Sequence, residues 1–163
     1  MPLTSFEELP GSARLWIFAA DHELSHPDSN RLLGEIDRFL MEWTAHRSHL
    51  TAGRDWKFNR FLFIGVDESA AGASGCSVDA LVREIQRLEK VIGVTLADRG
   101  PVLFRRGDAI ERVSRGQFAN LAGVGDVSPE TCVFDNTLST VGDVRAGRWE
   151  IPAREAWHGR AFF

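Results

Sequence analysis

The sequence has 163 residues and a formal net charge of −4, with 44% hydrophobic and 26% charged residues. These values are typical of a globular protein with one well-buried core, or one domain with a small appendage, and they exclude a disordered chain. No apolar stretch approaches the roughly 20 residues that a membrane span needs, and the N-terminus lacks the basic and apolar regions of a signal peptide. We therefore expect a cytoplasmic protein without membrane association. A pI near 5.7 weighs against general nucleic acid binding.

The two cysteines, Cys76 and Cys132, do not form the dense framework that is typical of small disulfide-stabilised domains, so we expect both thiols to be reduced. Neither the cysteines nor the histidines show the paired short spacing of a zinc site. The sequence predicts no metal site and no cofactor.

The first predicted elements are a strand at Arg14–Ala20 and a helix from about Asp28 to Ala45. A short strand at Leu50–Gly53 and a hydrophobic strand at Arg60–Val66 follow. The helix is predicted because its large apolar side chains recur at helical spacing. They are Leu32, Leu33, Ile36, Phe39, Leu40 and Trp43.

A loop of small residues, Asp67–Cys76, leads from the last of these strands to a second helix. We expect Ser77 to cap this helix and Gly93 to end it. Cys76 would then stand one residue before the cap, near the positive end of the helix dipole. That position favours the thiolate form of a cysteine and can hold an anion.

The order strand, helix, strand, strand, helix, completed by a fourth strand at Val102–Phe104, is the split β-α-β pattern of ferredoxin-like domains. We therefore predict an α+β protein with a ferredoxin-like core over residues 1–105 and a small C-terminal α+β extension over residues 106–163. The first and third strands are apolar on both faces, so the second face of the sheet must be covered. Either the extension or a second subunit could cover it, which leaves a homodimer open.

Within the extension, Ser114-Arg-Gly-Gln117 is a capping box that opens a short helix, and a strand is expected at Thr131–Phe134. The segment 102–134 resembles the GYF-related fold pattern, a small module found in many bacterial proteins. This resemblance implies a module for peptide interaction or packing rather than chemistry. The sequence departs from the pattern at its start, where Leu103-Phe104 stands in place of an aromatic pair.

Nearly the whole chain resembles a family of short uncharacterised bacterial proteins. The residues that carry this resemblance are Trp43-Thr-Ala-His46, Val66-Asp-Glu68, Ala71–Asp79, Val133-Phe-Asp135, Trp149-Glu150, Pro152 and Trp157-His158. Members often carry the label "ABC transporter ATPase". This chain has no Gly-x-x-x-x-Gly-Lys-Ser/Thr loop to hold phosphates, so it gives that label no support. The resemblance assigns no role to any residue.

Cys76 is the candidate nucleophile, and His46 and His158 are the candidate bases. We expect the two helices of a split β-α-β sheet to run roughly alike, which would place His46 and Cys76 at opposite ends of the sheet. On that topology His158 is preferred, and His46 is preferred if the fold differs. The alternative reading of Cys76 is a small residue that allows close packing of its loop.

The glycine-containing loop could bind phosphate or carboxylate through its amides, although such loops are also common turns between a strand and a helix. Asp67 and Glu68 could orient a histidine or bind a cation, or form a solvated loop mouth. The candidate ligand-binding residues are Gly72, Ser74, Gly75, Ser77, Asp67 and Glu68.

We therefore expect a binding site for a small anionic ligand at this loop, with thiol chemistry at Cys76, and leave open whether the protein is an enzyme. The alternative is a non-catalytic interaction module that binds a peptide or RNA through the C-terminal extension or through residues 54–61. In that stretch basic and aromatic residues alternate, as in strands on which RNA bases stack.

Overall fold

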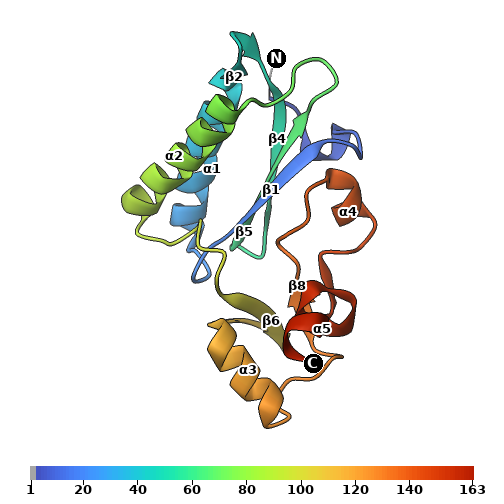
Figure 1. Ribbon diagram of the computed structural model, residues 1–163. Helices are drawn as coiled ribbons and strands as arrows, with labels where there is room; N and C mark the ends of the chain where they lie inside the picture. The colour runs from blue at the N-terminus through green and yellow to red at the C-terminus, as the bar shows by residue number, and fades with distance from the viewer. Residues whose placement is uncertain (1–2) are drawn as a thin grey trace. The chain divides into compact units, whose positions relative to one another are not determined.

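The computed structural model describes residues 3–163 and divides into two compact units (Figure 1). Unit 1 comprises the chain up to Ala97 together with Ser139–Gly142, and unit 2 comprises Asp98–Leu138 together with Asp143–Phe163. Both contain helices and antiparallel strands, so the predicted α+β class is confirmed. The domain boundary expected after residue 105 falls inside a strand of unit 2.

The sheet of unit 1 consists of β1 (Arg14–Ala19), β4 (Thr51–Lys57) and β5 (Phe61–Asp67), with β5 in the centre and antiparallel to both neighbours. This is the strand order of a split β-α-β unit. The prediction that Val102–Phe104 supplies the fourth strand is wrong, because β6 (Val102–Arg106) pairs with strands of unit 2. A complete ferredoxin-like sheet is not confirmed.

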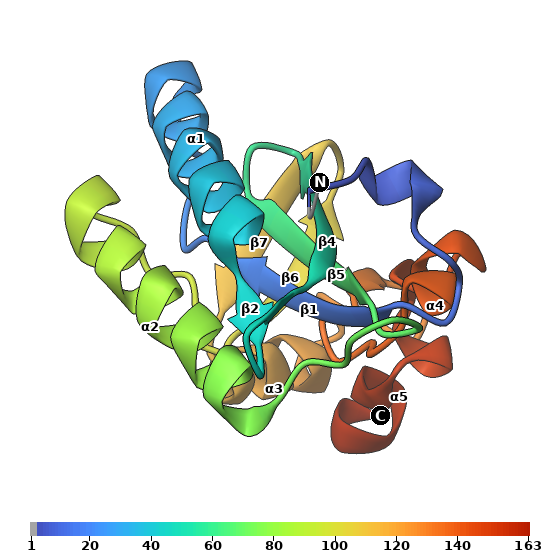
Figure 2. The ribbon, with the colours of Figure 1, turned by 90° about the horizontal axis from the view of Figure 1, so that it is seen from above.

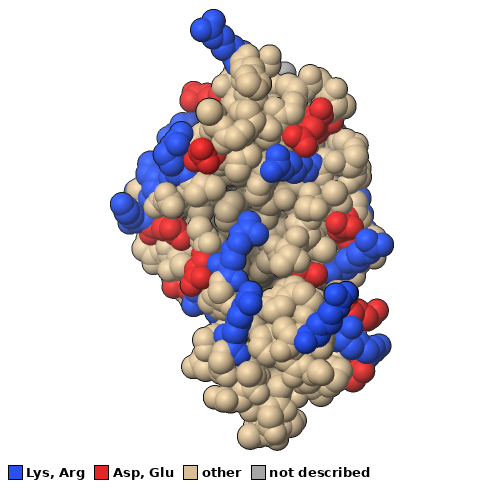
Figure 3. Space-filling model, in the orientation of Figure 1, with Lys and Arg blue, Asp and Glu red and all other residues tan. Residues whose placement is uncertain are grey.

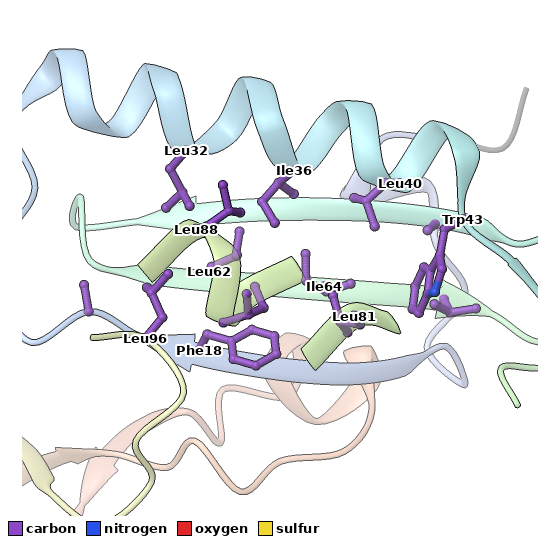
Figure 4. Close-up of a cluster of buried hydrophobic side chains, with 14 of the residues drawn as sticks. Phe18, Leu32, Ile36, Leu40, Trp43, Leu62, Ile64, Leu81, Leu88 and Leu96 are labelled. Carbon is purple, nitrogen blue, oxygen red and sulfur yellow. The ribbon is translucent and has the colours of Figure 1, made fainter. Parts of the chain in front are cut away.

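Two helices, α1 (His26–Glu42) and α2 (Gly75–Ile92), lie on one face of this sheet (Figure 2). α1 begins before the predicted start because the Ser25 side chain accepts a hydrogen bond from the Asp28 amide and caps it. Figure 4 shows apolar side chains from both helices pointing toward those of the strands. The fully buried members of this layer include Leu32, Ile36, Leu40, Leu62, Ile64, Leu81, Ile85 and Leu88.

The opposite face of the sheet is covered in part by the N-terminal segment. It forms a short 3-10 turn, η1 (Phe6–Glu8), whose Phe6 ring lies 6.2 Å from that of Phe63 in an edge-to-face arrangement. The segment crosses β4 at Gly53, where an added Cβ would lie 2.6 Å from the carbonyl oxygen of Thr4. Only a glycine allows this approach.

β4 extends to Lys57, beyond the predicted end at Gly53, because a tight turn at Phe58 and Asn59 joins it to β5. Both residues have positive φ, 58° and 53°. A small hairpin of β2 (Thr44–Ala45) and β3 (Ser48–His49) follows α1.

Unit 2 is built on a second sheet in the order β7-β6-β8-β9. The predicted capping box is confirmed, because Ser114 and Gln117 exchange side-chain hydrogen bonds with each other's backbone amides at the start of α3 (Arg115–Gly123). The core includes Phe104 and Phe118, whose ring centroids lie 5.3 Å apart. The other elements of unit 2 are β7 (Ala109–Val113), β8 (Cys132–Phe134), β9 (Glu150–Pro152), η2 (Ala153–Glu155) and α5 (Trp157–Phe162). The short helix α4 (Val141–Arg145) begins with two residues of unit 1 and continues in unit 2.

Within residues 3–163, no helix has both the length and the apolar character that crossing a bilayer would require.

Candidate functional site

The first turn of α2 begins earlier than the sequence suggested. Ser74, not Ser77, is the N-cap: its Oγ accepts a hydrogen bond from the Ser77 amide, and the Ser77 Oγ accepts one from the Ser74 amide at 2.6 Å. The prediction of a Ser77 cap is wrong because Ser77 holds the position where a capping box usually has Glu or Gln. Cys76 therefore lies inside the first turn, and it is exposed.

Two amides of the preceding loop donate hydrogen bonds to carboxylates of the same loop. Glu68 Oε2 accepts a hydrogen bond from the Ala73 amide at 2.9 Å, so an internal carboxylate occupies part of the predicted anion site. The Asp67 carboxylate accepts one from the Ser69 amide, and this bond lowers the pKa of Asp67. Both acids thus bind loop backbone in the structure.

Two amides at the helix start remain available. Among the residues that the structure describes, no acceptor lies within hydrogen-bond distance of the amides of Gly75 and Cys76. The first N–H groups of any helix lack partners inside the helix, and they point toward the positive end of its dipole. The start of α2 therefore offers two donors beside an exposed thiol.

The end of α1 meets the start of α2. The indole Nε1 of Trp43, the residue that ends α1, donates a buried hydrogen bond to the Ser77 carbonyl oxygen at 2.9 Å. The two helices therefore run in opposite directions, and the prediction that they run alike is wrong. It overlooked that β5 is antiparallel to β1, so the helix that returns from each strand is reversed as well.

This contact brings His46 to the same end of unit 1 as Cys76. The β2–β3 hairpin packs against α2, beside its first turns (Figure 2). Its turn is formed by His46 and Arg47, both exposed and both with positive φ, 51° and 67°. The geometric objection to His46 as the base is thereby removed.

His158, the other candidate base, lies in the core of unit 2 and is only 1% exposed. Its ring stacks on Trp157 with a centroid separation of 3.9 Å and meets Phe118 edge to face. Burial lowers the pKa of His158 to about 4, and the nearby Asp135 carboxylate opposes this shift only in part. Its Nδ1 atom is buried and has no hydrogen-bond partner among the described residues.

Several basic and aromatic residues of the 54–61 stretch are engaged within unit 1, whereas Phe58 is 44% exposed. Arg54 forms a bidentate ion pair with Asp37 at 2.8 and 2.9 Å. Arg60 is 8% exposed and donates to the backbone carbonyls of Ala20 and Asp21, and Phe61 is fully buried. On the face drawn in Figure 3, acidic and basic side chains lie next to one another. These features count against an RNA-stacking surface on this strand.

Unit 2 carries an open groove of about 850 Å³ that the sequence did not reveal. The sequence signal that could have indicated it is the Trp157-His-Gly-Arg160 spacing, which places an aromatic and a basic residue one helical turn apart. The groove is lined by Pro129, Asp135, Arg154, Glu155, Ala156, Trp157, Gly159, Arg160, Ala161 and Phe163.

No group of three or more His, Cys, Asp or Glu side chains in residues 3–163 is arranged to hold a metal ion. Comparisons of the chain with protein-family models, curated proteins and solved structures find no match. The functional proposal therefore depends on the surroundings of these residues.

Proposed function

We propose that the protein binds a small anionic ligand at the start of α2, where the Cys76 thiol is available to react with it. One observation carries this proposal: the amides of Gly75 and Cys76, in the exposed first turn of an 18-residue helix, have no acceptor among residues 3–163. Helix N-termini of this kind bind phosphate and carboxylate groups through N–H donors and the helix dipole.

The surroundings favour an anion in two further ways. The hairpin that carries the exposed Arg47 packs against the same helix and adds a positive charge at this end of unit 1. The hydrogen bond between Trp43 and Ser77 fixes the first turn, so less conformational entropy is lost on binding. Because Glu68 already binds the Ala73 amide, the ligand would use the helix amides rather than the whole loop from Gly72.

A thiol reaction is the second part of this proposal. The Cys76 sulfur would add to a carbonyl carbon of the bound ligand, the π electron pair of that carbonyl would move to its oxygen, and the thiol proton would pass to the imidazole of His46. The shared position of both residues at one end of unit 1 supports this assignment. Proton transfer requires the imidazole to come within hydrogen-bond reach of the sulfur or of one bridging water.

Protection of the thiol by an anion tests the proposal. We expect sodium phosphate, at constant ionic strength, to slow alkylation of Cys76 by iodoacetamide saturably, while the rate at Cys132 in the same sample stays unchanged. Arg47→Gln should weaken the protection, and Arg31→Gln, at an exposed position on α1, should not. Equal alkylation of Cys76 with and without phosphate would overturn the anion site.

A second candidate function is peptide recognition by unit 2. The observation that favours it is the open groove, in which two aromatic side chains, Trp157 and Phe163, stand beside Arg154 and Arg160. Exposed aromatic and arginine side chains are enriched where proteins bind one another.

Other finer assignments are also proposals. The strand order β1-β5-β4 supports a ferredoxin-like relationship for unit 1, although the fourth strand lies in unit 2. The relationship to the short bacterial proteins and to GYF-like modules, and a cytoplasmic location, are supported by the sequence alone.

A further inference from the structure

We propose that protonation of His158 releases helix α5 (Trp157–Phe162) from unit 2 while the sheet of unit 2 stays folded. This inference does not depend on either of the ligand sites proposed above. Several residues of α5 line the groove of unit 2, so acid would remove the groove together with the helix. They are Trp157, Gly159, Arg160 and Ala161.

α5 is docked on unit 2 by side-chain packing. The ring of Phe162 meets that of Phe118 with a centroid separation of 4.9 Å, and the Arg115 guanidinium lies 4.8 Å from the Trp157 ring centroid. Within residues 3–163, no backbone hydrogen bond joins α5 to α3 or to the sheet. The helix can therefore leave without breaking a backbone hydrogen bond of the sheet, which favours local opening over unfolding of the whole unit.

His158 is the buried ionisable residue of this contact. It is 1% exposed, stacks on Trp157 at 3.9 Å and meets Phe118 edge to face. Its Nδ1 atom is buried without a partner in the part of the chain that the structure describes. A protonated imidazole carries an N–H on both ring nitrogens, so protonation would bury a cation and an unpaired donor. The docked helix therefore holds the neutral form.

The charged groups around His158 do not compensate for its burial. Burial lowers the pKa of His158 to about 4, the Asp135 carboxylate after β8 opposes this shift, and the Arg115 guanidinium of α3 adds to it. The remaining charged side chains of η2 and α5 are exposed to solvent. They are Arg154, Glu155 and Arg160.

Release of α5 would return the imidazole to water, where its ordinary pKa of 6.5 applies. The released state then takes up a proton at a higher pH than the docked state. By linkage, release becomes more favourable as the pH falls below 6.5, and it gains nothing further below about pH 4. Between pH 7 and pH 5 these two pKa values raise the opening constant of α5 about 20-fold.

Native-state hydrogen exchange of the full chain, read by NMR at pH 7 and pH 5 and corrected for the intrinsic effect of pH on exchange, measures this opening. We expect the opening constants of the Ala161 and Phe162 amides to rise about 20-fold, because a released helix of six residues does not persist in water. Low concentrations of urea should leave this opening nearly unchanged, since it exposes little surface. The β6 amides should remain better protected and respond strongly to urea.

Two results in the parent protein would overturn the inference, and neither depends on the folding of a variant. One is an α5 opening constant that is the same at pH 7 and pH 5. The other is equal opening constants and equal urea dependence for α5 and β6, which would mean that the helix leaves only when unit 2 unfolds. His158→Phe, which keeps an aromatic ring, should remove the rise between pH 7 and pH 5. His26→Gln, at an exposed histidine, should preserve it.

Discussion

The Trp43 indole joins the end of one helix to the start of the other through its 2.9 Å hydrogen bond to the Ser77 carbonyl oxygen. Trp43 is 3% exposed and also contacts the rings of Phe39 and Trp16. The bond fixes the first turn of α2 against the end of α1. The proposed ligand site is therefore built on a buried aromatic cluster and not on the loop alone.

Removing this hydrogen bond should cost stability. Trp43→Phe keeps an aromatic ring but leaves the Ser77 carbonyl without the indole donor. Trp56→Phe is the matched control, because the Trp56 Nε1 is buried without a partner among the described residues and the loss of side-chain volume is the same. Urea unfolding should show Trp43→Phe to be less stable than Trp56→Phe by about 1 kcal/mol. Equal stabilities would mean that the bond contributes nothing net.

The crossing of the N-terminal segment over β4 requires a glycine at position 53. Gly53→Ala would place a Cβ 2.6 Å from the Thr4 carbonyl oxygen and 3.3 Å from the Phe6 amide nitrogen, both backbone atoms. We expect thermal unfolding to show a loss of about 1–3 kcal/mol. Gly34→Ala, inside α1 with nothing within 4 Å of its added Cβ, should gain about 0.5–1 kcal/mol. A neutral Gly53→Ala variant would show that the segment does not hold this position.

Three features of the fold show which structural properties can be predicted from the sequence and which cannot. The spacing of Leu32, Ile36 and Leu40 predicts a helix face that is indeed fully buried, because helical periodicity is a local property. The start of α2 was missed because both Ser74 and Ser77 fit a cap, and only the bonds between them decide. β6 belongs to the second sheet in part because it pairs with β8, which lies about thirty residues further along the chain. No local sequence pattern encodes this pairing.

Only part of the candidate site could be predicted from the sequence, because the rest of it depends on contacts between distant residues. The sequence indicated an exposed, chemically interesting turn at Cys76. The inward direction of Arg60, which is 8% exposed, and the meeting of Trp43 with Ser77 depend on tertiary packing. The groove beside Trp157 likewise forms only when α5 folds onto unit 2.

The stability of unit 2 should fall in acid because of His158. A histidine with a pKa of 6.5 in the unfolded chain and about 4 in the folded one takes up its proton more readily when unfolded. Its contribution is therefore fully present above pH 6.5, is lost as the pH falls, and is gone below about pH 4. We expect a loss of about 2 kcal/mol between pH 7 and pH 5.

Chemical denaturation at several pH values measures this effect. In His158→Phe, the free energy of unfolding should change less between pH 7 and pH 5 than in the parent protein. In His26→Gln, which replaces an exposed histidine, it should change as much as in the parent. A profile of the same slope in His158→Phe and the parent would assign the acid sensitivity to other groups.

The two thiols should differ in reactivity. Cys76 is exposed, whereas Cys132 is half-buried, and burial, followed by the Glu150 carboxylate, raises the pKa of the Cys132 thiol. Mass spectrometry after brief iodoacetamide treatment at pH 7.5 should find modification mainly at Cys76. Equal and slow labelling of both would support the reading of Cys76 as a packing residue.

The most direct measurement of the anion site is a phosphate titration followed by ¹H–¹⁵N NMR at constant ionic strength. The amides of Gly75 and Cys76 should shift saturably and more than any others, because these donors of the first turn of α2 have no acceptor in the part of the chain that the structure describes. The Ser77 amide, bound to Ser74 Oγ, should shift less. Shifts that are absent, or linear and spread evenly over the chain, would contradict the proposed anion site.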